Sequence, residues 1–175
     1  YTKEHLLAMV VEGKSPHTIP LSEDNKANED SAYQCRQIRY GKPTGRLVGG
    51  NLSLLTSMVG TEWEPDYKGA LAFIEDTGEK PYRVDRMLTQ LRQSNNFKEA
   101  AGIVFGTFND CAAKEGEDSL SLTETIDDRM SDLKIPSIYG LSFGHIKDQI
   151  TLPIGIEAEL DTRLQTLTIL EEAVK

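Results

Sequence analysis

The sequence has few cysteines and no long apolar run. Cys35 and Cys111 are its only cysteines; they match no zinc-binding spacing and are too few for a disulfide framework. This usage favours a reducing compartment, so we expect a cytoplasmic location. No apolar stretch approaches the roughly 20 residues that a membrane helix needs, and we therefore expect no membrane partner.

Basic residues are outnumbered by acidic ones. Lys and Arg number 19 and Asp and Glu number 28, which gives a formal net charge of −9 at pH 7. A nucleic-acid-binding domain normally carries a basic patch, and no Lys/Arg cluster occurs along this chain. We therefore expect no nucleic-acid partner. The acidic run at 115–118 predicts a solvated loop.

The length and composition are those of a globular domain. The chain has 175 residues, of which 38% are hydrophobic and 27% charged. This is enough for one domain, residues 1–175, with a sizeable core. The first residue is Tyr1 and no signal-peptide pattern follows, so we expect a fragment of a longer protein.

Apolar spacing predicts the elements of the first third. Apolar residues at helical spacing predict a helix over residues 2–11, and the Gly, Pro, Ser and Asn content of 12–31 predicts a surface loop. Partial alternation predicts an edge strand over 33–40, followed by a turn at 41–45. Residues 46–59 then predict a strand, a tight glycine turn and a helix.

Strands alternate with helices in the rest of the chain. The predicted elements are a buried strand at 69–74, a helix beginning at Pro81, a strand at 102–108, a helix from a capping box at Ser121-x-x-Glu124 through Leu133, and β-like stretches at 135–141, 152–160 and 164–170. This order predicts an α/β fold, and the β-rich ends suggest an additional antiparallel layer.

Glu75 is the clearest candidate for a functional residue that a local pattern indicates. It directly follows six apolar residues, at the carboxyl end of a strand where sites are commonly built. A partly buried carboxylate there needs a cation or a donor such as an imidazole. Alternatively, Glu75 or Asp76 caps the following helix or pairs with Arg83 or Arg86.

His145 follows Gly144 on a loop after a β-like stretch. Gly lets the backbone turn sharply, so the ring could face a cleft, although a surface histidine would look the same. The other histidines, His5 and His17, fit no metal-binding spacing. We expect neither a metal nor another cofactor.

The segment Gly49-Gly50-Asn51 suggests a turn that offers backbone N–H groups to an anion at a helix N-terminus. It lacks the spacing of a P-loop, and a structural turn with Asn51 as N-cap is the alternative. Four residues are nucleophile candidates by type alone, and none lies in a G-x-S-x-G elbow: Ser53, Ser57, Ser142 and Cys111.

Taken together, four segments resemble the C-terminal domain of the LD-carboxypeptidase family, which includes muramoyltetrapeptide carboxypeptidases and microcin-immunity peptidases. They occur in the family's order: GRLVGGNLSLL at 45–55, GALAFIEDTGEKPYRVDRMLTQL at 69–91, GIVFGTFNDC at 102–111 and GLSFGHIKDQITLPIGIEAELD at 140–161. Residues 1–44 match the linking segment less specifically. The resemblance implies a swivelling β/β/α-type domain with a mixed sheet.

The resemblance also implies a Ser-Glu-His triad. The family's glutamate falls on Glu75 and its histidine on His145, with Glu79 as a competing match in the same loop. Glu75 is preferred because it comes directly off the strand. The family's serine lies on an N-terminal domain that residues 1–175 do not contain, so we expect this chain alone to be inactive.

The implied substrate is a murein-derived tetrapeptide that loses its terminal D-Ala. Its carboxylate needs a cation or N–H donors, and the candidates are Gly50, Asn51 and Arg83, although Arg83 could instead anchor its helix against Asp76 or Asp85. The resemblance further implies the serine-bearing N-terminal domain as partner and a homodimer for the intact protein.

Two other functions stay open. One is a non-catalytic binding module that lacks the serine half. The other is a microcin-immunity-type peptidase acting on a peptide–nucleotide conjugate, which should need an aromatic side chain for stacking. Trp63 is the only Trp, and we expect it to pack in the turn before the strand at Gly69.

Overall fold

A mixed eight-stranded sheet lies at the centre of the chain, which a computed structural model describes over residues 1–94, 96–114, 116 and 118–174. The strand order is β1-β8-β7-β3-β4-β5-β6-β2. In chain order the strands are β1 (His17–Ile19), β2 (Arg36–Arg39), β3 (Thr44–Asn51), β4 (Leu71–Glu75), β5 (Gly102–Phe105), β6 (Ser137–Tyr139), β7 (Glu157–Asp161) and β8 (Thr166–Ile169). The predicted α/β fold with a mixed sheet is confirmed.

Five α-helices accompany the sheet in the part of the chain that the structure describes. They are α1 (Thr2–Val10), α2 (Glu23–Lys26), α3 (Leu52–Met58), α4 (Pro81–Arg92) and α5 (Leu122–Met130), and two short 3₁₀ turns lie at Ser31–Tyr33 and Phe97–Glu99. The helices predicted from Pro81 and from the capping box are confirmed, and the box itself forms between Ser121 and Glu124. α5 ends at Met130, one turn before the predicted end.

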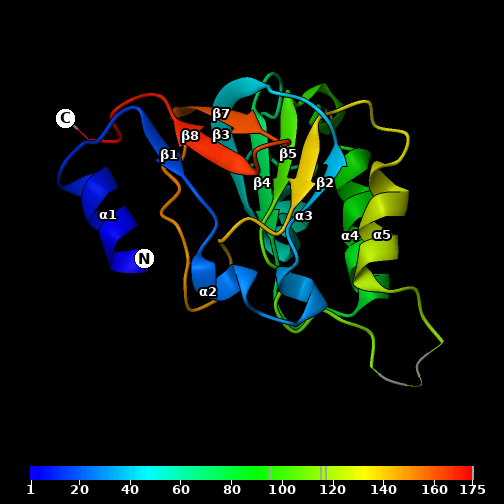
Figure 1. Cartoon of the computed structure of the whole chain (residues 1–175). Helices are drawn as coiled ribbons and strands as arrows, with labels where there is room; N and C mark the ends of the chain where they lie inside the picture. Colours follow the sequence, from blue (N-terminus) through cyan, green and yellow to red (C-terminus); the bar gives the residue numbers. More distant parts are fainter. Residues whose placement is uncertain (95, 115, 117, 175) are drawn as a thin grey trace.

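The parallel strands β3 to β6 carry helices α3, α4 and α5 on one face (Figure 1). Val84, Leu88 and Leu91 recur at i, i+4 and i+7 on α4, and all three are fully buried against the sheet. Their partners include Ile74 and Phe105, which are equally buried. This layer fixes the carboxyl ends of β3, β4 and β5 at one edge of the sheet.

The antiparallel strands β7, β8 and β1 extend the sheet beyond β3, with α1 beside them (Figure 1). A second apolar cluster joins Met9 of α1 to Leu71 and Val104 of the parallel strands and to Leu160 of β7. It covers the sheet face opposite α4. The antiparallel strands expected from the β-rich ends are present, but they extend the same sheet and do not form an additional layer.

Two local predictions were wrong. Residues 12–31 are not one surface loop, because β1 and α2 lie within them. β1 has only three residues, too few to show a period, and it forms by pairing His17 with Ile169 far along the chain. The predicted turn at Gly49-Gly50-Asn51 is also wrong, since β3 runs through both glycines and pairs with β4 as far as Asn51.

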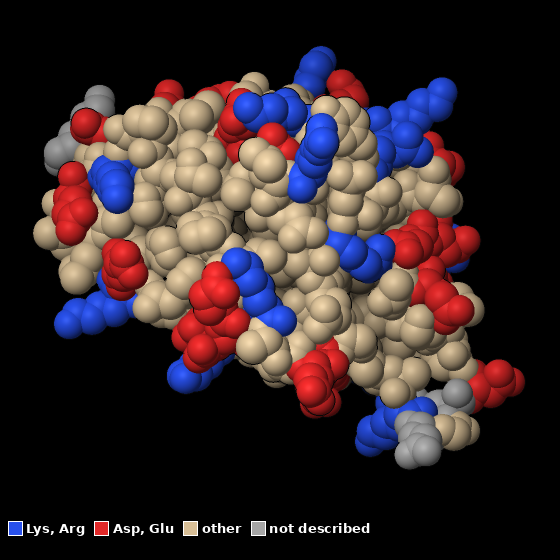
Figure 2. All heavy atoms as spheres, in the orientation of Figure 1, with Lys and Arg blue, Asp and Glu red and all other residues tan. Residues whose placement is uncertain are grey.

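The described surface mixes charges of both signs. Figure 2 shows Lys and Arg side chains interspersed with Asp and Glu on the face in view. Glu115 and Glu117 of the acidic run lie outside the described residues, so the loop predicted there stays a prediction. Within the described ranges no helix is both long and apolar enough to cross a membrane. Both cysteines are free, and Cys111 is buried.

Two histidines that the sequence left unconnected form a buried pair. His5 Nδ1 of α1 and His17 Nε2 of β1 lie 3.0 Å apart. His5 is 6% exposed and His17 is 8% exposed. Burial lowers the pKa of both rings below their ordinary value; the charge of His17 lowers the pKa of His5 further, and that of Lys14 lowers the pKa of His17. The pair can hold only one hydrogen between its facing nitrogens, so protonation of both rings breaks it.

The pair predicts acid sensitivity. Since both folded-state pKa values lie below the unfolded value of 6.5, the unfolded chain takes up protons first as the pH falls. Stability should therefore be highest above pH 6.5 and should fall below it. Urea unfolding between pH 8 and pH 5 measures this, and the His5→Asn/His17→Gln double variant should lose stability less steeply over that range. An equal slope in the double variant would contradict the prediction.

Candidate active site

The candidate site forms where β3 and β4 end together. The two strands are parallel, and their register places Asn51, the last residue of β3, opposite Glu75, the last residue of β4. The five residues of β4 are all buried, so the carboxylate emerges from a hydrophobic strand at the sheet edge. Glu75 itself is 9% exposed.

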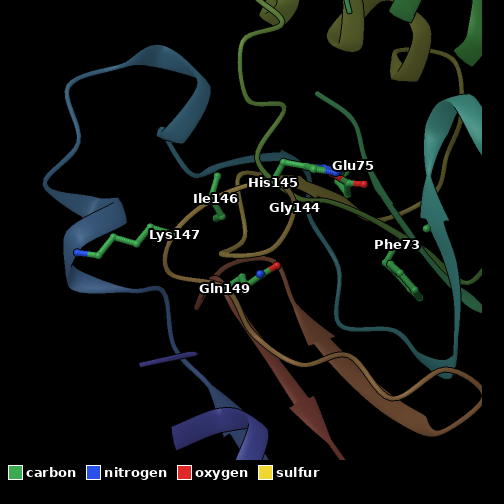
Figure 3. A pocket seen from close by; sticks show the side chains of 8 residues that line it. Phe73, Glu75, Gly144, His145, Ile146, Lys147 and Gln149 are labelled. Atoms are coloured by element: carbon green, nitrogen blue, oxygen red, sulfur yellow. The ribbon is translucent and has the colours of Figure 1, made fainter. Parts of the chain in front are cut away.

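Glu75 and His145 form a hydrogen-bonded pair. His145 Nδ1 lies 2.8 Å from Glu75 Oε2. The side chain of Glu75 is 11% exposed and that of His145 is 58% exposed, so the ring stands between the buried carboxylate and solvent. Figure 3 shows the two side chains directed toward each other. A neutral ring that donates from Nδ1 leaves its Nε2 able to accept a proton.

Gly144 lets the histidine loop approach the carboxylate. Its φ of +124° is a conformation that side chains rarely adopt, and a Cβ there would lie 2.7 Å from Thr107 O and 3.2 Å from Glu75 Oε2. The loop is fixed by the bond from Thr107 N–H to Phe143 O, and the ring of Phe143 packs edge-on against Phe73 of β4. The sequence feature that suggested a sharp turn before His145 therefore has a steric cause.

The pair lies on the wall of a cavity of about 620 Å³. The residues that line it are Gly50, Phe73, Glu75, Gly144, His145, Ile146, Lys147 and Gln149. Gly50 has open space where a side chain would project, so its backbone is accessible from the cavity. Lys147 extends away from the pair (Figure 3) and lies 3.6 Å from Asp24 of α2. No local sequence pattern indicates Phe73, Lys147 or Gln149 as site residues; the fold brings them to this cavity.

Asn51 is engaged inside the protein. Its Oδ1 accepts from Leu54 N–H at 3.2 Å, which confirms the predicted N-cap of α3. Its Nδ2 donates to Glu75 Oε1 at 3.3 Å and to Asp76 Oδ1 at 3.0 Å. The three polar positions of the amide all have partners, so a substrate would have to displace one of them to bind Asn51.

The first turn of α3 already has an anion beside it. Asp76, which is 3% exposed, accepts from Ser53 N–H at 3.0 Å and from Ser53 Oγ at 2.8 Å. The predicted anion-binding turn therefore faces a carboxylate of the chain itself. Neither Glu75 nor Asp76 caps α4, whose N-cap is Lys80, and neither pairs with Arg83 or Arg86, so that alternative is wrong.

Arg83 and Glu79 bind each other. Arg83 Nη1 lies 3.3 Å from Glu79 Oε2, one turn apart at the start of α4, and Arg83 is not among the cavity-lining residues. The suggested anchors Asp76 and Asp85 are therefore not its partners; Asp85 pairs with Arg129. His145 lies against Glu75 and not against Glu79, which favours the residue that comes directly off the strand.

Two further expectations concern Trp63 and metals. Trp63 was expected to pack in the turn before β4, but it is 74% exposed, so this prediction was wrong. It does not line the cavity. Over the described ranges, no group of three or more His, Cys, Asp or Glu side chains is placed to hold a metal ion.

Comparison with known proteins adds the family. Residues 44–160 match the LD-carboxypeptidase C-terminal domain. The chain belongs to the LD-carboxypeptidase family. It is 44% identical over 129 residues to the "Probable murein peptide carboxypeptidase" of Bacillus subtilis, covering 74% of this chain and 40% of that protein.

Other relatives of this LD-carboxypeptidase domain include a muramoyltetrapeptide carboxypeptidase and a microcin self-immunity protein. The crystal structure of muramoyltetrapeptide carboxypeptidase from Oxalobacter formigenes superposes with a TM-score of 0.77 at 32% identity, over 97% of this chain and 54% of that one. The microcin C7 self-immunity protein MccF of Escherichia coli is 31% identical over 163 residues, which is 90% of this chain and 46% of that protein. The chain thus spans about half of these relatives or less.

Proposed function

We propose that this chain is the C-terminal part of a serine LD-carboxypeptidase that removes terminal D-Ala from murein tetrapeptides. In this proposal Glu75 and His145 supply two members of a Ser-Glu-His triad. The observation that carries it is the 2.8 Å hydrogen bond between a buried carboxylate and a half-exposed imidazole on a cavity wall. The relatives named for murein peptides support the substrate class.

Each member of the pair has a distinct role. Glu75 accepts the Nδ1 hydrogen, which holds the ring in the tautomer whose Nε2 is free, and it stabilises the imidazolium formed during the reaction. Nε2 of His145 takes the proton of the attacking serine and then delivers it to the leaving D-Ala amine. Burial of Glu75, which is 9% exposed, strengthens this electrostatic support, because fewer water molecules screen it.

The nucleophile is proposed to come from an N-terminal domain of the same protein. The serines near the site are engaged: Ser53 Oγ donates to Asp76, and Ser142, which is 1% exposed, accepts from Ser22 N–H. Neither has a histidine as partner. A Glu-His pair without a serine cannot form an acyl-enzyme, so residues 1–175 alone should show no peptidase activity.

Three residues were predicted to contact the substrate carboxylate, and they differ in whether they are accessible from the cavity. Of the three predicted contacts, Gly50 lies on the cavity wall with an accessible backbone, whereas Asn51 and Arg83 have internal partners. We propose that backbone groups near Gly50 contact the peptide and that Asn51 acts within the site. Because the two cysteines are free, as is usual in a reducing compartment, the proposed location is the cytoplasm; the proposed assembly is a homodimer.

The similarity to MccF supports a second candidate, a peptidase that acts on a peptide–nucleotide conjugate. Trp63, the only Trp, is exposed and lies off the cavity wall, so it offers no stacking surface inside this cavity. Phe73, the aromatic residue on the wall, is only 7% exposed and packs edge-on against Phe143. This arrangement favours the murein peptide.

The full-length gene product should be assayed with a murein tetrapeptide and, in parallel, with an aminoacyl sulfamoyl nucleotide. We expect release of D-Ala from the first and little turnover of the second, and no turnover of either by residues 1–175 alone. Turnover of the nucleotide conjugate only would support the second candidate. A full-length gene product that contains no serine-bearing domain, and that binds the peptide without cleaving it, would support a non-catalytic binding module instead.

A further inference from the structure

Asp76 lies beside the Glu75–His145 pair without touching the imidazole. Four donors surround its carboxylate: Asn51 Nδ2 at 3.0 Å, Ser53 N–H at 3.0 Å, Ser53 Oγ at 2.8 Å and Thr77 N–H at 2.8 Å. A carboxylate that is 3% exposed and accepts four hydrogen bonds is held rigidly, because losing any one of them leaves a buried group unsatisfied.

The amide of Asn51 connects this carboxylate to the catalytic candidate. Its two N–H groups divide between Asp76 Oδ1 and Glu75 Oε1. Its orientation cannot reverse without cost, because Oδ1 accepts from Leu54 N–H at the start of α3. A reversed amide would direct its oxygen at two carboxylates and its NH₂ at a backbone donor.

We infer that Asp76 is a positioning residue that acts through Asn51 on Glu75. Asp76 fixes the amide of Asn51, the amide holds Oε1 of Glu75, and Oε2 is thereby left directed at Nδ1 of His145. This series of hydrogen bonds is given by the contacts themselves. Its importance for catalysis rests on the function proposed above.

The ring tautomer of His145 reports this positioning. A free neutral imidazole prefers its hydrogen on Nε2, whereas a fixed Glu75 carboxylate selects Nδ1–H. Nitrogen-15 NMR of residues 1–175, at a pH where the ring is neutral, gives the ratio of the two tautomers. Asp76→Asn replaces one carboxylate oxygen by an NH₂ group that must face either the N–H of Ser53 or the donors of Asn51 and Thr77, so the four donors can no longer all be accepted. The weaker hold on the Asn51 amide should lower the Nδ1–H to Nε2–H ratio about fivefold.

Asn51→Ser tests the same series of hydrogen bonds at the residue that joins the two carboxylates. Ser can still cap α3 by accepting from Leu54 N–H, but it removes the amide that joins the two carboxylates. It should lower the tautomer ratio by the same factor and leaves the charge of Asp76 in place, so the inference stays testable if Asp76→Asn does not fold. The double variant should show no further fall, since both changes break one path.

The matched control is Asp66→Asn. Asp66 also accepts from an Asn amide, that of Asn96, and from a backbone N–H, that of Lys68, but it precedes β4 whereas Glu75 ends it. Its tautomer ratio should equal that of the parent chain. An unchanged ratio in folded Asp76→Asn or Asn51→Ser would overturn the inference, and additive effects in the double variant would do so as well, because they would indicate a charge effect that bypasses Asn51.

Kinetics of the full-length gene product separate this inference from the proposed function. With Asp76→Asn we expect kcat for D-Ala release to fall at least fivefold while KM changes little. A shifted tautomer ratio with unchanged kcat would support the positioning role and contradict the catalytic role of the pair. A lower kcat with an unchanged tautomer ratio would overturn the positioning role.

Discussion

Replacing His145 by Ala in the full-length gene product should reduce kcat for D-Ala release by about 10⁴-fold or more. His145 is the only group placed to take a proton beside Glu75 among the described cavity-lining residues, and its ring is more than half exposed. Little packing is lost with the ring, so the thermal unfolding temperature should change by only a few degrees. Steady-state kinetics and calorimetry on the same preparation measure both quantities.

Glu75→Gln is the companion variant. It keeps the size of the side chain and the contact with Asn51 but removes the charge that stabilises an imidazolium, so kcat should fall by about 10²-fold or more. Glu79→Gln is its control, because Glu79 lies in the same loop and bonds Arg83. Normal turnover by His145→Ala would show that the triad assignment is wrong, and a loss confined to Glu79→Gln would move the acid to that residue.

Gly49→Ala should destabilise the chain by about 3 kcal/mol or more. Gly49 is paired with Phe73 in the parallel ladder, and a Cβ on it would lie 1.9 Å from Phe73 O. The obstruction is backbone in the centre of the sheet, so no side chain can rotate to relieve it. A loss of this size is a large fraction of the stability of a domain and should be visible as a lower urea midpoint.

Gly60→Ala is the matched control for that measurement. Gly60 also has a positive φ, +80°, but nothing lies within 4 Å of the position that its Cβ would take. Its substitution should cost only the conformational strain, about 1 kcal/mol. If the two variants were equally stable, the close approach of β3 to β4 would not be the reason for glycine at position 49.

The parts of the fold with local signals could be predicted from the sequence. Pro81 followed by apolar residues at helical spacing gave α4, the Ser121–Glu124 capping box gave the start of α5, and six apolar residues gave β4. The same strand made Glu75 a candidate, because a partly buried carboxylate at the end of a strand needs a cation or a donor as partner. Its pairing with His145 needed the family resemblance, since 70 residues separate the two in the chain.

The parts that depend on distant contacts could not be predicted. β1 exists only because it pairs with β8, about 150 residues later, and the His5–His17 pair follows from that pairing. The Gly49-Gly50 segment predicted a turn, because a glycine required by a close backbone approach cannot be told from a turn glycine in the sequence alone. No local pattern indicates the contacts of Asp76, because its four donors come together only once β3, β4 and α3 have packed.

Covalent labelling of the full-length gene product with a fluorophosphonate, which reacts with an activated serine, tests the triad most directly. We expect one labelled serine outside the segment that corresponds to residues 1–175, and labelling that slows by about 10³-fold or more in His145→Ala. Labelling of a serine within residues 1–175, or labelling at an undiminished rate in His145→Ala, would contradict the triad assignment.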